Sequence, residues 1–302
     1  MTILRDLFSK HVLAFSVIGS LLYSCGTGTE ADKEQLLDAS DTIKSAVLNV
    51  AGELFSVPSP IQTAMLIQKS GIAYDHSILS STNKVNTFST DYSRALNLGV
   101  YGADLGYVSL YSQTQDALGY LAAIKSLSDK LGLSAAFDAA TMERIKNNIT
   151  NKDSMMVLVG LAYRGSDAYL KDNQRTEVGS LILAGGWLES MHFSSMAYRN
   201  KPSDPIRYRI AEQKQALTSI LKILGSSTSG EVIELTAGLK DLAKIYEGIS
   251  FKYNFIEPVH DSTKKITYIN STTEVIVTDE QLTQIVEKVK IIRAKIVNSE
   301  KS

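Results

Sequence analysis

The sequence predicts an all-α fold: a multi-helix bundle of packed helical hairpins, with a small β-hairpin before the C-terminal helix. Apolar residues recur at intervals of three and four along nearly every long segment, which is typical of amphipathic helices. Prolines, which break helices, number only five among 302 residues. The pattern changes to alternation over residues 264–278, which are rich in Thr, Ile and Val, and this change predicts a hairpin around Asn270-Ser271.

The helices are expected in the following order. The first covers residues 36–55, and Pro60 opens the second, which ends at Gly71. The periodicity then predicts seven more helices, at residues 89–112, 115–131, 134–149, 154–171, 177–197, 206–224 and 230–248. The last helix starts at Thr278, where Gln281 completes a capping box. Its apolar residues form one face: Leu282, Ile285, Val286, Val289, Ile292 and Ile296.

The N-terminus predicts a lipid anchor. Residues 12–24 are mostly apolar but shorter than the roughly 20 residues that span a membrane, and residues 1–24 therefore suit a signal peptide. The segment Leu22-Tyr23-Ser24-Cys25 resembles a bacterial lipobox, which implies that Cys25 is acylated, for example with palmitate, after the preceding peptide is removed. Cys25 is the only cysteine, so it forms no internal disulfide. The alternative is an ordinary signal or anchor with an incidental cysteine.

The chain after this anchor is expected to be one folded domain. Residues 25–35 carry the acylated cysteine and a polar, flexible tether, and residues 36–302 form a single α-helical domain. The formal net charge is −1, and such a near-neutral balance argues against nucleic acid as a partner. A basic segment, residues 197–209, is either a solvated connector or a contact with anionic lipid headgroups.

Small residues form stripes on two predicted central helices. One stripe contains Ala95, Gly99, Gly102, Gly106 and Ser109, and the other contains Gly179, Gly186, Ser190 and Ala197. Because each interior glycine costs about 1 kcal/mol relative to alanine, we expect close packing of the two backbones to offset the cost. A methyl group at Gly102 or Gly106 should then have no room, whereas it would fit if the stripe lined a ligand cavity. Residues 102–111 and 185–194 are either copies of a duplicated hairpin or simply two similar apolar helices.

Four segments, "VPSPIQTAMLIQKSG", "ALNLGVYGADLGYVSLYSQTQDAL", "NNITNKDS" and "LAGGWLES", resemble a group of Bacteroidota-type predicted lipoproteins of unknown function. The similarity spans most of the mature chain. It implies a lipoprotein anchor and a helical fold. It supplies no catalytic residues.

Two anomalies on apolar helices mark a candidate site. Glu189-x-x-His192 has the spacing of one half of a di-iron carboxylate site, but no second copy exists, so hydrogen-bonded polar residues at a helix interface are the favoured interpretation. Asp104 is a carboxylate on an otherwise apolar helix, and burial would require partners or a raised pKa. With the aromatic residues Tyr107 and Trp187, these three form the predicted ligand-binding set.

The predicted function is therefore non-catalytic. Phosphate-binding loops, nucleophile elbows, zinc-protease motifs and dinucleotide fingerprints are missing from the sequence, and we expect no enzyme activity, cofactor or metal. The favoured function is a lipid-anchored cell-envelope protein that binds or scaffolds, with an envelope protein as a possible partner. It would reside on the outer membrane or on the periplasmic face of a membrane. The alternative is a helical carrier that binds a small apolar ligand between its central helices.

Overall fold

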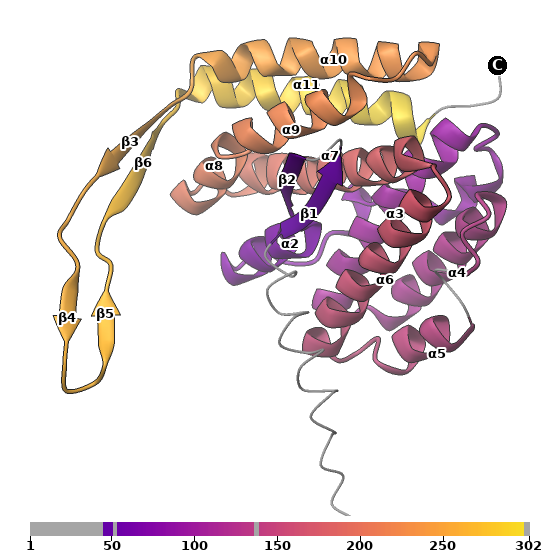
Figure 1. Ribbon diagram of the computed structural model, residues 1–302, viewed down its shortest axis with the longest axis horizontal. Helices are drawn as coiled ribbons and strands as arrows, with labels where there is room; N and C mark the ends of the chain where they lie inside the picture. Colours follow the sequence, from indigo (N-terminus) through magenta and orange to yellow (C-terminus); the bar gives the residue numbers. More distant parts are fainter. Residues whose placement is uncertain (1–44, 51–52, 136–138, 299–302) are drawn as a thin grey trace, which may run out of the picture.

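The computed structural model describes residues 45–50, 53–135 and 139–298. Its described α-helices, ten in number, pack against one another and dominate the fold, which confirms the predicted all-α class (Figure 1). They are α2 (Pro60–Lys69), α3 (Asp91–Leu110), α4 (Thr114–Lys130), α5 (Ala139–Asn147), α6 (Lys152–Asp172), α7 (Thr176–Asn200), α8 (Asp204–Ala211), α9 (Lys214–Leu224), α10 (Gly230–Glu247) and α11 (Asp279–Val297). Two short 3₁₀ helices, His76–Ile78 and Thr82–Asn86, lie between α2 and α3.

The helix boundaries follow the predicted signals. Pro60 occupies the first turn of α2, and Gly71 follows its end with a φ of 70°, which favours glycine. Thr278 and Gln281 form the expected capping box at the start of α11, through hydrogen bonds of 3.1 and 2.9 Å. None of the described helices combines the length and apolar character needed to span a membrane.

Helices α3 and α7 form the centre of the fold, and almost every residue of each is buried. Their backbones touch where they cross. A methyl group on Gly99 would overlap the carbonyl oxygen of Ile182, and one on Gly185 would overlap the carbonyl oxygen of Leu96. Main-chain atoms of one helix therefore pack directly on those of the other, which only glycine permits at these two positions.

The close contact lies at Gly99, a member of the predicted stripe, and not at Gly106, where a methyl group is predicted to have no room. A methyl group on Gly106 would meet side-chain atoms of Ile61 at 3.6–3.7 Å, an ordinary van der Waals distance. The expectation that Gly106 has no room is therefore wrong, because the neighbour there is a side chain of α2 and not the backbone of α7. The decisive glycine of α7 is Gly185, which lies outside its predicted stripe.

Two predicted helices differ from the structure. Within residues 36–55 the described part is a hairpin, in which β1 (Ser45–Val50) pairs antiparallel with β2 (Glu53–Pro58), from Ser45↔Pro58 to Val50↔Glu53. Alternating Val, Leu and Phe residues favour strands there, although their spacing also matches a helix. The predicted helix 206–224 is divided into α8 and α9 because the chain turns at Glu212 and Gln213.

The β-hairpin before the C-terminal helix is present but longer than predicted. Strand β3 (Ser250–Asn254) pairs with β6 (Thr272–Ile276), and β4 (Val259–Asp261) pairs with β5 (Ile266–Tyr268), all antiparallel. The chain reverses between β4 and β5, so Asn270-Ser271 lies along one side of the ribbon and not at its turn. We call residues 250–276 the arm, which stands away from the helical body and joins α10 to α11 (Figure 1).

Candidate functional site

Three of the predicted site residues converge on one buried polar cluster. Glu189 and His192 lie one turn apart on α7, Asp104 comes from α3, and all three are less than 9% exposed. The cluster also includes Arg293 of α11 and the segment 78–80, which enters between the helices. Elements far apart in the sequence therefore meet at this point.

Arg293 neutralises Glu189 through a two-pronged ion pair. Its Nε and Nη2 atoms donate to the two carboxylate oxygens of Glu189, each at 2.6 Å. Nη2 also donates to Ile78 O at 3.1 Å and to Ser80 Oγ at 2.9 Å. Burial alone would lower the pKa of Arg293, but the charge and hydrogen bonds of Glu189 outweigh that effect and raise it. This two-pronged pair fastens α11 to α7 inside the protein.

Asp104 lies in surroundings that favour its protonated form. Its Oδ2 accepts from the backbone N–H of Ser80 at 3.3 Å, but its fully buried Oδ1 finds no donor among the described residues. Burial, and next the negative charge of Glu189, raise the pKa of Asp104 well above its ordinary value, against the smaller lowering effect of Arg293. A proton on Asp104 would supply the hydrogen for its contact with the Glu189 carboxylate, since two ionised carboxylates would repel.

His192 is a neutral hydrogen-bond donor. Its Nε2 lies 2.9 Å from Ile78 O, and because a carbonyl only accepts, this nitrogen carries the hydrogen. Burial, the largest influence, lowers the pKa of His192. Glu189 is thus bound by Arg293, and His192 is bound by a main-chain carbonyl. Among the described residues, no group of three or more His, Cys, Asp or Glu side chains is arranged to hold a metal.

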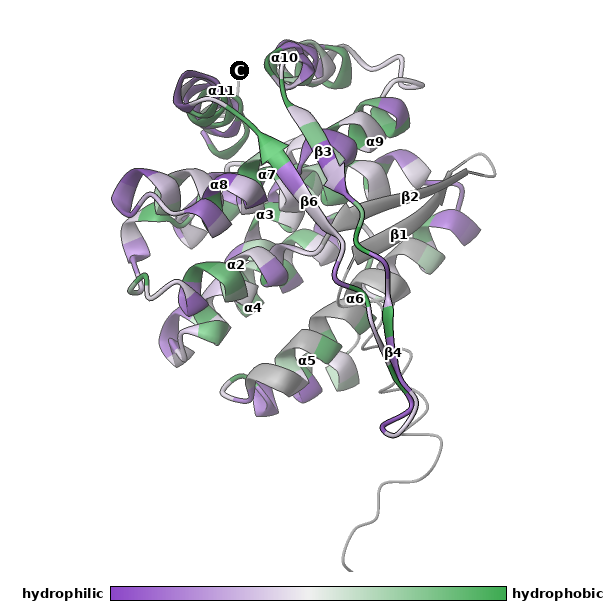
Figure 2. Ribbon diagram, turned by 90° about the vertical axis from the view of Figure 1, so that its left-hand side faces the viewer, coloured by the Kyte–Doolittle hydropathy of each residue, from purple (hydrophilic) through white to green (hydrophobic). Residues whose placement is uncertain are grey.

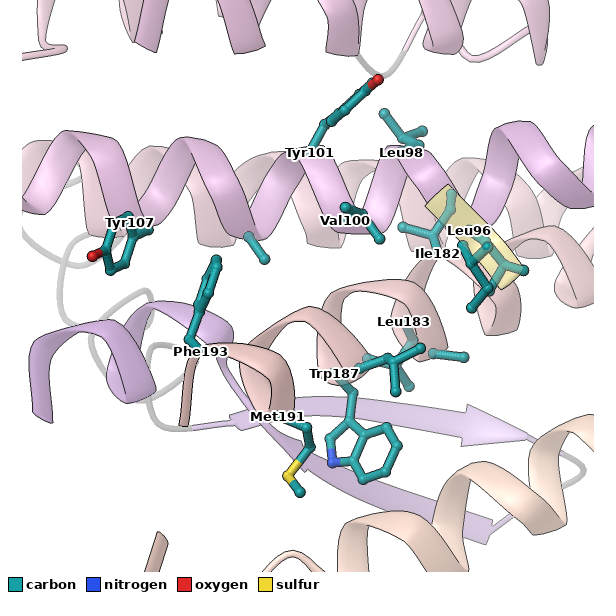
Figure 3. Packing of buried hydrophobic residues seen from close by; sticks show 14 of the residues in the cluster. Leu96, Leu98, Val100, Tyr101, Tyr107, Ile182, Leu183, Trp187, Met191 and Phe193 are labelled. Atoms are coloured by element: carbon teal, nitrogen blue, oxygen red, sulfur yellow. The ribbon is translucent and has the colours of Figure 1, made fainter. Parts of the chain in front are cut away.

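Tyr107 and Trp187 lie apart from this cluster. Tyr107 stacks with Phe193 at a ring-centroid distance of 4.9 Å and with Tyr111 at 4.8 Å, and its hydroxyl accepts from Asp75 N. Trp187 points away from α3 on the other side of α7 (Figure 3). Its Nε1 donates to Oε1 of the buried Gln213 at 3.1 Å, at the turn that separates α8 from α9. The five predicted ligand-binding residues therefore lie in three separate environments. The predicted acylation site, Cys25, lies outside the described residues.

A cleft of about 280 Å³ opens beside the cluster. Its walls include Lys84, Lys290 and Arg293, no carboxylate, and the apolar side chains of Leu79, Phe88 and Val297. Asn97 lines it too, with Nδ2 bound to Ser93 O and Ile296 O while its buried Oδ1 lacks a partner among the described residues. Lys84 is already engaged, since its Nζ donates to Asn298 Oδ1 at 2.5 Å and binds Val297 O at the end of α11.

Sequence reasoning misses Arg293, Ser80 and Asn97. A signal for Arg293 exists, because it follows Val289 by four residues and precedes Ile296 by three, so it stands on the apolar face of α11. The segment 78–80 carries no comparable pattern. In the basic segment 197–209, Arg207 pairs with Asp279 and Arg209 pairs with Glu212, both at the surface of the same chain.

Comparison with protein-family models, with curated proteins and with solved structures finds no match to this chain. The resemblance to Bacteroidota-type predicted lipoproteins stays a prediction. The function is therefore argued from the geometry of the chain itself.

Proposed function

We propose that this chain is a lipid-anchored cell-envelope protein that binds or scaffolds a protein partner, and that the arm is its contact surface. The anchor would be Cys25, at the end of the apolar N-terminal segment. This placement leaves the helical body as a rigid support and the arm as the part that reaches outward.

The observation that carries the proposal is the concentration of exposed apolar side chains on the arm. Of the twelve large hydrophobic residues that the described part of the chain exposes, nine belong to the arm. They are Phe251, Tyr253, Phe255, Ile256, Val259, Ile266, Tyr268, Ile269 and Ile276. Apolar segments alternate with polar ones along the arm (Figure 2), which stands away from the body (Figure 1). Scattered exposed hydrophobic residues are normal, whereas a concentration of this kind marks an interaction surface.

The buried cluster supports a structural role for the central helices. Its charges are paired and its histidine is neutral, so it connects α3, α7 and α11 without an open reactive group. This arrangement fits a scaffold whose body holds one shape.

One specific observation favours the alternative function, a helical carrier of a small apolar ligand. The contact at Gly99 and Gly185 leaves no space for a ligand where α3 and α7 cross. Further along, a hollow of about 240 Å³ is lined by apolar residues that include Ile67, Tyr107 and Phe193. A small apolar ligand carried by this protein would bind there, and native mass spectrometry of the extracted protein would reveal it.

The arm is tested by the size of the complexes that the full chain forms in the envelope. Phe255→Ser with Ile269→Ser removes the two most exposed arm residues, 70% and 75% exposed, and a matched control, Ile233→Ser, removes a 56% exposed residue of α10. After mild detergent extraction and native electrophoresis, wild type and the control should migrate as complexes larger than one chain, and the arm variant should not. Equal migration of all three would overturn the proposal.

A further inference from the structure

We infer that the partner of the arm is a second copy of this chain, so that two arms pair to form a dimer. The inference rests on the proposed function of the arm as a contact surface. It goes further by naming the occupant of that surface.

The exposed area of the arm matches one side of a dimer interface. The nine apolar residues are 43% to 75% exposed. With aromatic and long aliphatic side chains of roughly 150–250 Å² each, they present on the order of 800 Å² of surface. A standard interface buries about 800 Å² from each partner, whereas the largest apolar patch of a typical monomer is about 300–600 Å². Summed over both faces, the exposed apolar area of the arm is therefore comparable with one side of a dimer interface.

The apolar residues favour one face within each half of the ribbon. Residues directly opposite in an antiparallel pair share a face. Phe251 opposite Val275 and Tyr253 opposite Thr273 lie on one face near the body, and Lys252 opposite Glu274 lies on the other. Further out, Val259 opposite Tyr268 shares a face, whereas His260 and Thr267 pair on the reverse, joined by a 3.0 Å hydrogen bond. Each half thus has one face richer in apolar side chains, although Ile276, opposite Ser250, lies on the face of Lys252 and Glu274.

The balanced charges of the arm are compatible with contact between two copies of the same surface. Between residues 250 and 276 there are three lysines and three carboxylates: Lys252, Lys264, Lys265, Glu257, Asp261 and Glu274. A surface that binds its own copy repels itself if it carries charges of one sign, so balance is required for a two-fold contact. A membrane with anionic lipids or a strongly charged partner would be matched by an excess of one sign, which the arm lacks.

The outer edges of the arm also carry main-chain N–H and C=O groups that could pair with another strand. A two-stranded ribbon is marginally stable by itself, and three or more strands with an apolar face are needed for independent stability. Each strand of the arm pairs only with the other strand of the same ribbon among the described residues, so both outer edges keep unpaired N–H and C=O groups. Two arms side by side would form a four-stranded sheet that satisfies one edge of each, and two arms packed face to face would cover the apolar faces.

The test is site-specific photo-cross-linking of the full chain in its envelope. The photoreactive residue p-benzoylphenylalanine replaces Tyr253, which is 63% exposed on β3, and the control places it at Ile233 on α10. We expect irradiation at position 253 to give an adduct of about twice the chain mass, in which mass spectrometry finds arm peptides joined to arm peptides. Position 233 should give none.

The outcomes separate this inference from the proposed function. An adduct between position 253 and a different protein would overturn the dimer while leaving the arm as a contact surface. An adduct with lipid alone, or no adduct, would overturn both. As a second measurement, two differently tagged copies should co-purify, and Phe255→Ser with Ile269→Ser should reduce recovery roughly tenfold or more, given that interface anchors typically contribute over about 1 kcal/mol each. Undiminished recovery would refute arm pairing even if the chains associate.

Discussion

Replacing Gly99 by alanine puts a methyl group against main-chain atoms of α7, where no side chain can rotate away. The new Cβ would lie 2.7 Å from Gly186 N and would overlap Ile182 O. Helix propensity favours alanine by about 1 kcal/mol, but overpacking typically costs about 1–3 kcal/mol and backbone neighbours place this site at or beyond the upper end. The net loss should be about 2 kcal/mol. At about 2–4 °C per kcal/mol for a chain of this size, the melting temperature should fall by roughly 4–8 °C.

Gly106→Ala is the matched control, in the same helix and two turns away. Its methyl group would meet Ile61 at 3.6 Å, so the propensity gain should dominate and the melting temperature should hold or rise by up to about 4 °C. The melting temperature of Gly185→Ala should fall as that of Gly99→Ala does, because the added methyl group presses on Leu96 O from the opposite side of the crossing. Thermal melts followed by far-ultraviolet circular dichroism measure all three. A Gly99→Ala variant that melts at or above wild type, or a Gly106→Ala variant that falls equally far, would refute the account of the crossing.

Three further predictions concern the buried cluster and the anchor. Because burial and the charge of Glu189 raise the folded pKa of Asp104, the stability that its protonated form provides is fully present below about pH 3.9, the unfolded pKa, and is lost as pH rises through the folded pKa. Asp104→Asn should therefore gain melting temperature relative to wild type as pH increases, and a difference that does not change with pH would count against a proton on Asp104. Arg293→Met should cost about 3–5 kcal/mol in denaturant unfolding because it leaves Glu189 buried and unpaired, and adding Glu189→Gln should recover part of the loss; a double variant no more stable than the single one would contradict the pairing. Cys25→Ala should abolish labelling by an alkyne fatty acid and release the protein from membranes, and persistent labelling would disprove acylation at this residue.

Sequence reasoning reaches the helices whose ends carry local signals. Pro60 and the Thr278–Gln281 box mark their helices because capping chemistry involves residues three apart at most. The segment 36–55 misleads because Val47, Val50 and Leu54 are spaced like a helical face, whereas the structure pairs residues 45–50 with the adjacent residues 53–58 in a hairpin. Gln213, at the division between α8 and α9, also has a partner distant in the sequence, because its Oε1 accepts from the indole N–H of Trp187.

The candidate site shows the same limit. Asp104 and Glu189 stand out as charges on apolar helices, so a pattern finds them. Arg293 looks like one more charge on an amphipathic helix, and Ser80 sits in a loop without periodicity. What joins them is the crossing of α3 and α7 under α11, and the position of that crossing depends on backbone contacts at Gly99 and Gly185 that side-chain patterns do not encode.

The root of the arm makes it a lever on the helical body. Strand β3 leaves α10, and β6 runs directly into α11, the helix that carries Arg293. Lys214 Nζ holds Ile249 O at 2.9 Å, and Arg207 binds both Val277 O, at 3.2 Å, and Asp279, so both strands are clamped where they enter the body. Tension applied to the arm would therefore be shared between α11, which β6 enters directly, and α8 and α9, which these contacts hold. The root of the arm thus connects a force on the arm to three helices of the body at once.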